Sequence, residues 1–249
     1  MSYSEQQVAS LRSHFNDLVL YEDSRILVMN KPAGVSVTGD EVNRVGVSEI
    51  AKELRGSEIA LAHRLDMYTS GVLLLGKTRG ARRSLSDQFK ERQIGKTYLA
   101  LVDGEWNPSL AGIVAPIFRS EDEGLMKVGL NNQAKPAATA FEEIAQLGIG
   151  EQLRSLLKVD LLTGRTHQIR VHLAYLGYPV TGDQLYNPDK LGFIRPLLHA
   201  YEISFRHPHT EEEMILTAPL ADDFYSYLAN SWVLNHSGFF EEVIANSAN

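Results

Sequence analysis

Apolar and polar positions alternate along this chain with two different periods. Residues such as Val8, Leu11 and Phe15 recur at the spacing of one helix face. This spacing predicts helices over about residues 5–19, 79–93, 166–176 and 221–233. Short apolar runs bounded by turn-forming residues predict strands over about residues 25–30, 71–77, 97–102, 112–117, 125–130, 136–145, 153–162, 197–206 and 213–218. Because strands outnumber helices and several follow one another directly, we expect an α+β fold with a large, mainly antiparallel but mixed sheet and flanking helices.

One pair of charges interrupts the apolar pattern. Arg64 and Asp66 lie between two apolar runs, residues 59–62 and 72–75. Charges within core-forming sequence are costly to bury unless they are paired or used. The sequence Thr-Ser-Gly at 69–71 suits a turn, because hydroxyls bond nearby backbone and glycine tolerates unusual dihedral angles. The pattern therefore predicts a carboxylate presented at the end of a buried element.

The composition excludes several classes of protein. With 249 residues and no Pro/Gly/Ser-rich linker, the chain fits one domain, which two lobes can form. It has no cysteine, which excludes disulfides, thiolate catalysis and cysteine-ligated metals. No apolar run approaches the length of a membrane span, and the N-terminus lacks a signal-peptide pattern. We expect a soluble, cytoplasmic monomer without membrane contact.

The charge is unevenly distributed. The net charge of −7 argues weakly against a nucleic-acid partner, but much of the excess acid lies after residue 202. Residues 77–96 instead hold seven basic and two acidic side chains, a local charge of +5. This basic segment is either an electrostatic footprint for phosphates or a solvated helix face.

Several common kinds of site fit the sequence poorly. His63 with Asp66, and His167 with His172, match none of the stronger zinc motifs, and neighbouring arginines would repel a divalent ion. Ser70 lies outside any Gly-x-Ser-x-Gly elbow, which disfavours a serine hydrolase. The turn at 164–166 suits a phosphate at a helix N-terminus but lacks the ending of a P-loop. Metal binding and nucleoside-triphosphate chemistry are therefore disfavoured.

Several ordered motifs together resemble the RluA family of pseudouridine synthases. The first two are His-Arg-Leu-Asp at 63–66 and the Thr-Ser-Gly that follows it. The others are Lys-Pro-Ala-Gly at 31–34, Lys-Thr-Tyr-Leu-Ala-Leu-Val at 96–102, Gly-Arg-Thr-His-Gln-Ile-Arg-Val-His at 164–172, Gly-Asp at 182–183 and Leu-His-Ala at 198–200. The ordered combination is far more specific than any one motif.

The resemblance implies a pseudouridine-synthase-like fold with a central catalytic cleft. It places the catalytic domain at 24–235, after a helical extension at 1–23 and before a tail at 236–249. It implies an enzyme that detaches uracil from ribose in ribosomal or transfer RNA, rotates it and rejoins it through carbon. No cofactor or metal is needed, because no atom or electron is exchanged with another molecule.

The resemblance also implies three catalytic roles. Asp66 would be the nucleophile or base, and which of the two stays open. Arg170 would pair with Asp66 and keep its carboxylate ionised, since a planar guanidinium can hold a carboxylate with two hydrogen bonds. Tyr98 would stack on the extruded base and assist proton transfer at the ring.

RNA binding is predicted from the same resemblance and from the basic segment. Arg64 would fill the gap left by the flipped uridine, which lowers the cost of extruding a base. Although Arg64 and Asp66 are only two residues apart, we expect that they do not form an ion pair with each other. The absence of the N-terminal S4 domain of many relatives predicts that the catalytic domain itself recognises RNA. The further predicted RNA contacts are Thr69, Lys77, Arg82, Arg83, Lys96, Arg165 and His167.

Two alternatives remain open from the sequence. A catalytically silent relative would use the same cleft as an RNA clamp or chaperone, although the presence of Asp66, Tyr98 and Arg170 disfavours it. A nucleobase or nucleotide hydrolase would use Asp66 on free nucleotides. Tests of isomerisation in RNA and of free nucleosides separate these alternatives.

Overall fold

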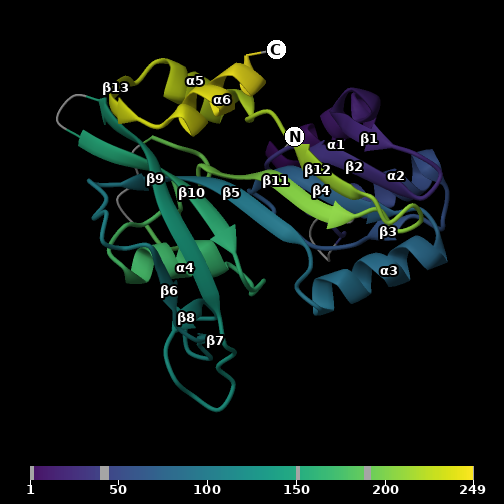
Figure 1. Cartoon of the computed structure of the whole chain (residues 1–249), viewed down its shortest axis with the longest axis horizontal. Helices are drawn as coiled ribbons and strands as arrows, with labels where there is room; N and C mark the ends of the chain where they lie inside the picture. The colour runs from purple at the N-terminus through teal and green to yellow at the C-terminus, as the bar shows by residue number, and fades with distance from the viewer. Residues whose placement is uncertain (1–2, 40–44, 150–151, 188–191, 249) are drawn as a thin grey trace. The chain divides into compact units, whose positions relative to one another are not determined.

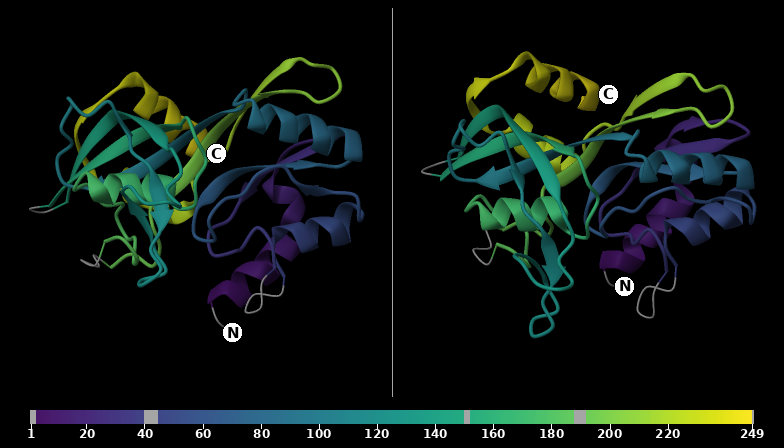
Figure 2. Two further views of the ribbon diagram at one scale, coloured as in Figure 1. Left: turned by 90° about the horizontal axis from the view of Figure 1, so that it is seen from below. Right: turned by 60° about the horizontal axis from the view of Figure 1, so that its bottom comes forward.

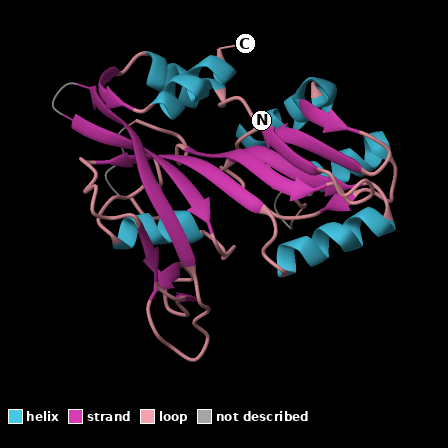
Figure 3. Ribbon diagram, viewed as in Figure 1, coloured by secondary structure: helices cyan, strands magenta, loops and turns pink. Residues whose placement is uncertain are grey.

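The computed structural model describes residues 3–39, 45–149, 152–187 and 192–248. The chain divides into two compact units, which we call the first unit (residues 1–95 and 200–221) and the second unit (residues 96–199 and 222–249). In both units helices flank the paired strands (Figure 3). The described part of the chain contains no helix that is both long and apolar enough to cross a membrane.

The described residues of the first unit form paired strands flanked by α-helices (Figure 1). Its elements are α1 (Tyr3–Ser13), a 3-10 helix (Phe15–Leu18), β1 (Val19–Glu22), β2 (Ile26–Lys31), α2 (Val47–Arg55), β3 (Ala60–Leu61), β4 (Ser70–Gly76), α3 (Arg79–Lys90), β11 (Leu198–Arg206, from residue 200 onward) and β12 (Glu213–Thr217). The strand order is β1-β2-β4-β11, with β3 also on β4 and β12 on β11. The pairs β1–β2, β2–β4, β3–β4 and β11–β12 are antiparallel.

The core of the first unit forms where the sequence has its longest apolar runs. All seven residues of β4 are buried, as are five of the six in β2. Leu85 on α3 and Phe205 on β11 pack into the same cluster. The Thr78 side chain caps α3 by accepting a hydrogen bond from the Ala81 amide at 3.2 Å. This bond satisfies a free amide of the first turn, and the helix begins at the next residue, Arg79.

The second unit combines a long antiparallel hairpin with one buried helix. Its elements are β5 (Gly95–Asp103), β6 (Gly112–Val114), β7 (Ile117–Arg119), β8 (Met126–Val128), β9 (Ala138–Ile149), β10 (Gln152–Leu161), α4 (Gln168–Tyr175), α5 (Asp222–Ala229), β13 (Trp232–His236) and α6 (Gly238–Ser247). Its strand order is β5-β10-β9-β13, with β6 also on β9. The loop of the β7–β8 hairpin extends away from the rest of this unit (Figure 2).

The α+β prediction is confirmed, and most of the predicted elements are present. The helix predicted over 5–19 ends at Ser13, because the chain turns into a 3-10 helix and then into β1. The helix predicted over 221–233 ends at Ala229, and β13 follows it on the edge of β9. The predicted C-terminal tail contains α6, whose Phe240 and Val243 are buried.

Candidate active site

Asp66 lies in the loop between β3 and β4 of the first unit. Asp66 is partly exposed, and its backbone carbonyl accepts a hydrogen bond from the Thr69 amide at 3.1 Å. The amide of Gly34 binds the carbonyl of Met67 at 2.9 Å, which ties this loop to the turn after β2. The acid therefore lies on a loop fixed by backbone hydrogen bonds at Asp66 and Met67, shortly before the buried strand β4.

Lys31 anchors the same loop from within the core. The residue is fully buried, and its Nζ donates to the carbonyls of Pro32, Val35 and Met67 at 2.8, 2.9 and 3.0 Å. A buried ammonium is tolerated when its protons are taken up by such acceptors. Sequence reasoning treated this lysine only as part of a turn. The buried lysine instead joins that turn to the residue directly after Asp66.

Two further residues of the motif around Asp66 have structural roles. Gly71 has φ +107°, and a Cβ there would lie 2.1 Å from the Ala200 carbonyl oxygen. Only glycine is compatible with this conformation and this close approach to β11. His63 Nε2 accepts a hydrogen bond from the Leu74 amide at 3.1 Å, so this nitrogen is unprotonated. The histidine thereby satisfies a backbone donor of β4.

In the second unit, Gln168 organises the entry to α4. Its Oε1 accepts from the Thr163 hydroxyl at 2.7 Å and the Arg165 amide at 3.0 Å. Its Nε2 donates to the Ala138 carbonyl and the Thr139 hydroxyl, both at 2.9 Å. The residue before it, His167, has the left-handed φ of 55°. This buried amide therefore fixes the turn from which the predicted RNA contacts project.

Arg170 is buried in the same helix and binds Asp183. Its Nε and Nη2 donate to the two carboxylate oxygens at 2.6 and 2.8 Å, and Asp183 is fully buried. The amides of Leu185 and Tyr186 also donate to Asp183 Oδ1, at 3.0 and 3.3 Å. Residues 168–173 are all buried, so Arg170 does not lie on a solvent-exposed face of α4. Asp183 is a site residue that sequence reasoning recorded only as part of a motif.

Tyr98 and Lys96 lie at the start of β5, next to the turn that precedes α4. Tyr98 is 7% exposed and pairs across the sheet with Val159 on β10. A Cβ on Gly164 would lie 3.8 Å from Lys96 Nζ, which places this ammonium beside the turn. Burial lowers the pKa of Lys96. Two of the predicted blocks, Lys-Thr-Tyr and Gly-Arg-Thr-His, are therefore neighbours in the fold.

The predicted RNA contacts of the first unit differ in their surroundings. Arg64 is exposed and forms no hydrogen bond or ion pair with any residue that the structure describes. The side chain of Arg83 is 88% exposed, and its Nε lies 4.0 Å from Asp87 Oδ2. Arg82 binds the exposed Glu58 at 3.1 Å. Thr69 is buried, and its amide closes the Asp66 turn.

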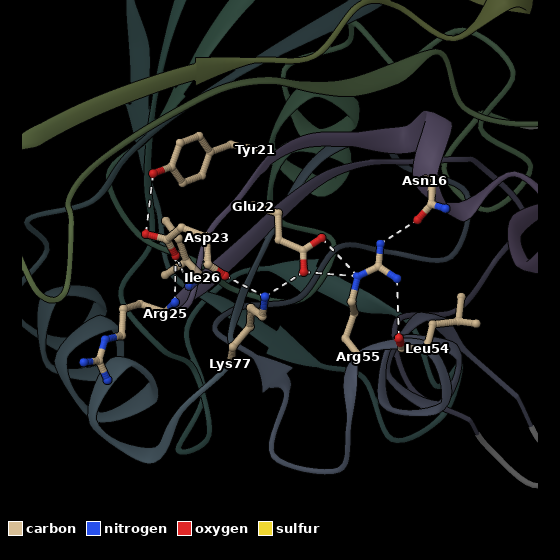
Figure 4. A network of polar contacts seen from close by, with 9 residues as sticks. All are labelled: Asn16, Tyr21, Glu22, Asp23, Arg25, Ile26, Leu54, Arg55 and Lys77. Carbon is tan, nitrogen blue, oxygen red and sulfur yellow. Dashed lines mark hydrogen bonds and ion pairs between the residues drawn. The ribbon is translucent and has the colours of Figure 1, made fainter.

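Lys77 has a structural position that the sequence did not indicate. Its ammonium donates to Glu22 at 2.7 Å and to the Asp23 carbonyl at 2.6 Å (Figure 4). Arg55 binds the same Glu22 carboxylate, through Nε at 3.0 Å. Burial would raise the pKa of Glu22, but the hydrogen bonds and charges of Lys77 and Arg55 outweigh it and hold that pKa below its ordinary value. We therefore assign Lys77 a structural role, because its charge is already paired with that of Glu22.

The predicted chemical residues are divided between the units. Arg64 and Asp66 belong to the first unit, while Tyr98, Arg165 and Arg170 belong to the second. The predicted pairing of Asp66 with Arg170 stays a prediction. Within the described residues, no group of three or more histidine, aspartate or glutamate side chains is placed to hold a metal ion.

Comparison with known proteins identifies the family. Residues 25–175 match the profile of a family described as RNA pseudouridylate synthase. A ribosomal large subunit pseudouridine synthase C of Haemophilus ducreyi is 40% identical over 235 residues, covering 90% of this chain and 70% of the relative. One of the same name from Vibrio vulnificus is 38% identical, covering 84% and 68%. The solved structure of human RNA pseudouridylate synthase domain containing 1 aligns with a TM-score of 0.76 at 28% identity, covering 93% and 94%. The chain belongs to the RNA pseudouridylate synthase family, whose members isomerise uridine in RNA to pseudouridine.

Proposed function

We propose that Asp66 carries the chemical step, as the nucleophile or base of uridine isomerisation. The observation that carries this proposal is the construction of its loop. The fully buried Lys31 donates a hydrogen bond of 3.0 Å to the backbone carbonyl of Met67, the residue directly after Asp66. A loop held in this way keeps a carboxylate at a fixed place, which is what positioning a reacting group requires.

The reaction needs no outside reagent. The bond from the ring nitrogen to the sugar breaks, the base rotates, and a bond from a ring carbon to the same sugar carbon forms. The ring carbon then loses its proton, and the ring nitrogen gains one. Because atoms and electrons balance within the nucleotide, the proposal includes neither cofactor nor metal.

Arg170 and Tyr98 take the supporting roles in this proposal. The Arg170 guanidinium is oriented by Asp183, whose two carboxylate oxygens accept hydrogen bonds from Nε and Nη2. We assign to this oriented guanidinium the pairing with the Asp66 carboxylate. Tyr98, buried on β5 beside the Gly164 turn, would stack on the uracil and assist the proton transfer.

Arg64 is assigned to opening the RNA. Its exposed guanidinium has no ion-pair partner among the described residues, so it can enter a base stack without breaking a protein contact. Extruding a base costs a few kcal/mol, and a planar cation in the gap offsets part of that cost. Lys96, Arg165 and His167 would then contact the phosphates and the sugar around the flipped nucleotide.

We propose that the substrate is ribosomal RNA of the large subunit. Two relatives of this chain at 40% and 38% identity carry that substrate in their names. Such a substrate also places the protein in the cytoplasm, where we propose that it acts as a monomer. Mapping pseudouridines in total RNA from cells with and without the gene tests the assignment. Loss of a site in large-subunit RNA that only the active gene restores is expected, and loss confined to transfer RNA would overturn it.

A further inference from the structure

Tyr186 lies at the junction of three parts of the second unit. Its ring packs beneath Arg170, its hydroxyl contacts His167, and its backbone amide reaches Asp183. It also packs on the small cluster of Ile117, Ala137 and Val171. None of the roles assigned above uses this tyrosine, although it touches two residues that have them.

The hydroxyl of Tyr186 connects His167 to the β7–β8 hairpin. It accepts a hydrogen bond from the Met126 amide at 3.2 Å and lies 2.9 Å from His167 Nδ1. The two rings meet edge to face, with centroids 5.7 Å apart. Because the contact uses Nδ1, the Nε2 atom of His167 lies on the opposite side of its ring. The tyrosine therefore fixes the direction in which His167 presents its second nitrogen.

The backbone of His167 makes this contact informative. A non-glycine residue at φ 55° is strained, and such strain persists only where surrounding contacts hold it. The buried Gln168 amide holds the turn on one side, and the Tyr186 hydroxyl holds the His167 ring on the other. The strained residue is also one that the sequence assigned to RNA binding.

The ring of Tyr186 serves Arg170 instead. The Arg170 Cζ atom lies 5.2 Å from the ring centroid, within the range of a cation–π contact. In the plane of the guanidinium, Asp183 holds Nε and Nη2. The carboxylate thus fixes the guanidinium within its plane, and the ring restrains it across that plane.

We propose that Tyr186 is a positioning residue with two separable effects, one through its ring on Arg170 and one through its hydroxyl on His167. This inference rests on the function proposed above, in which Arg170 supports the chemical step and His167 contacts RNA. The ring therefore governs turnover, and the hydroxyl governs binding of RNA.

Two substitutions separate these effects in steady-state isomerisation of an RNA substrate. Tyr186→Phe keeps the ring and removes the hydroxyl, so it should raise KM about 3- to 10-fold and leave kcat within about 2-fold. Tyr186→Leu removes the aromatic face as well and should lower kcat about 10-fold or more. Tyr175→Phe is the matched control, because Tyr175 is 65% exposed at the end of α4, the helix that carries Arg170, and should change neither constant. Circular dichroism checks that each variant folds, and Tyr186→Met replaces Tyr186→Leu if that variant does not.

A double-mutant cycle with His167→Ala tests the path from the hydroxyl. If Tyr186→Phe acts through His167, it should have no further effect on KM once His167 is alanine. An undiminished effect in that background would overturn the hydroxyl half of the proposal. A folded Tyr186→Leu or Tyr186→Met variant with unchanged kcat would overturn the ring half. Wild-type protein that never isomerises uridine would instead refute the proposed function, so the two failures are distinguishable.

Discussion

Arg170 and Asp183 form a buried, doubly hydrogen-bonded ion pair, with Nε–Oδ2 at 2.6 Å and Nη2–Oδ1 at 2.8 Å. Asp183 is fully buried and Arg170 is 6% exposed. Such a pair is strongly directional, because a planar guanidinium meets a planar carboxylate in one geometry. It gives the arginine a fixed orientation that does not depend on RNA.

Removing the acid of this pair should destabilise the protein severely. Asp183→Ala removes the carboxylate that binds this buried guanidinium, and we expect a loss of about 3–5 kcal/mol in the free energy of unfolding. Urea denaturation followed by circular dichroism measures it. Asp87→Asn is the control: Asp87 pairs with exposed Lys90 and Arg83, so about 0.5 kcal/mol or less is expected. A loss from Asp183→Ala as small as the control's would mean that the pair does not hold the arginine.

Lys31→Met should uncouple the Asp66 loop from the core. Three carbonyls lose their hydrogen-bond donor, so we expect the free energy of unfolding to fall by about 2–4 kcal/mol and kcat to decrease. Thermal unfolding and single-turnover isomerisation are the measurements. Lys52→Met, at an exposed position on α2, provides the comparison and should change neither. If Lys31→Met unfolds at the wild-type temperature and turns over normally, the anchoring role is refuted.

The acid dependence of stability should include a contribution from Glu22. Its pKa lies below the ordinary value in the folded protein, so its contribution is present above the unfolded pKa of about 4.3 and is lost as pH falls through the folded pKa. Glu22→Gln should therefore cost about 1 kcal/mol near pH 7 and almost nothing near pH 2. Denaturation at a series of pH values tests this. A cost that is the same at both ends of the series would contradict it.

The long apolar runs made the core of the fold predictable. β2 and β4 read as continuous hydrophobic segments because both are buried almost throughout, and α3 is recognised by its apolar stripe. β13 is different: Trp232, Val233 and Leu234 are apolar, but all five residues of the strand are exposed, so its apolar residues do not mark a buried segment. Its place on the edge of β9 depends on backbone pairing, which the side-chain pattern does not report.

RNA binding should depend on Arg83 but not on Lys77. Arg83 is exposed, and Arg83→Ala should reduce the slope of log K against log salt concentration by about 0.7 to 0.9 if it contacts one phosphate. Lys77→Ala should leave the slope unchanged, because Glu22 already compensates that ammonium. Filter binding over a series of salt concentrations measures both. Equal slopes for wild type and Arg83→Ala would remove Arg83 from the RNA-binding surface.

The candidate site was predictable as a set of motifs but not as a set of contacts. Asp66, Tyr98 and Arg170 can be named as candidates from the sequence because each stands in a distinctive motif. Asp183 and Lys31 were missed as contributors, because their importance comes from burial and from partners distant in sequence. The ion pair of Lys77 with Glu22 could not be predicted for the same reason: a basic segment does not show which of its charges already have an acidic partner.

The most direct test of the account is single-turnover isomerisation of uridine in large-subunit ribosomal RNA by Asp66→Asn. Asparagine keeps the size of the side chain but has no anionic oxygen to attack or to accept a proton. We expect RNA binding and thermal stability close to wild type and a rate reduced by about 10⁴-fold or more. Turnover within about 10-fold of wild type in the folded variant would contradict the assignment of the chemistry to Asp66.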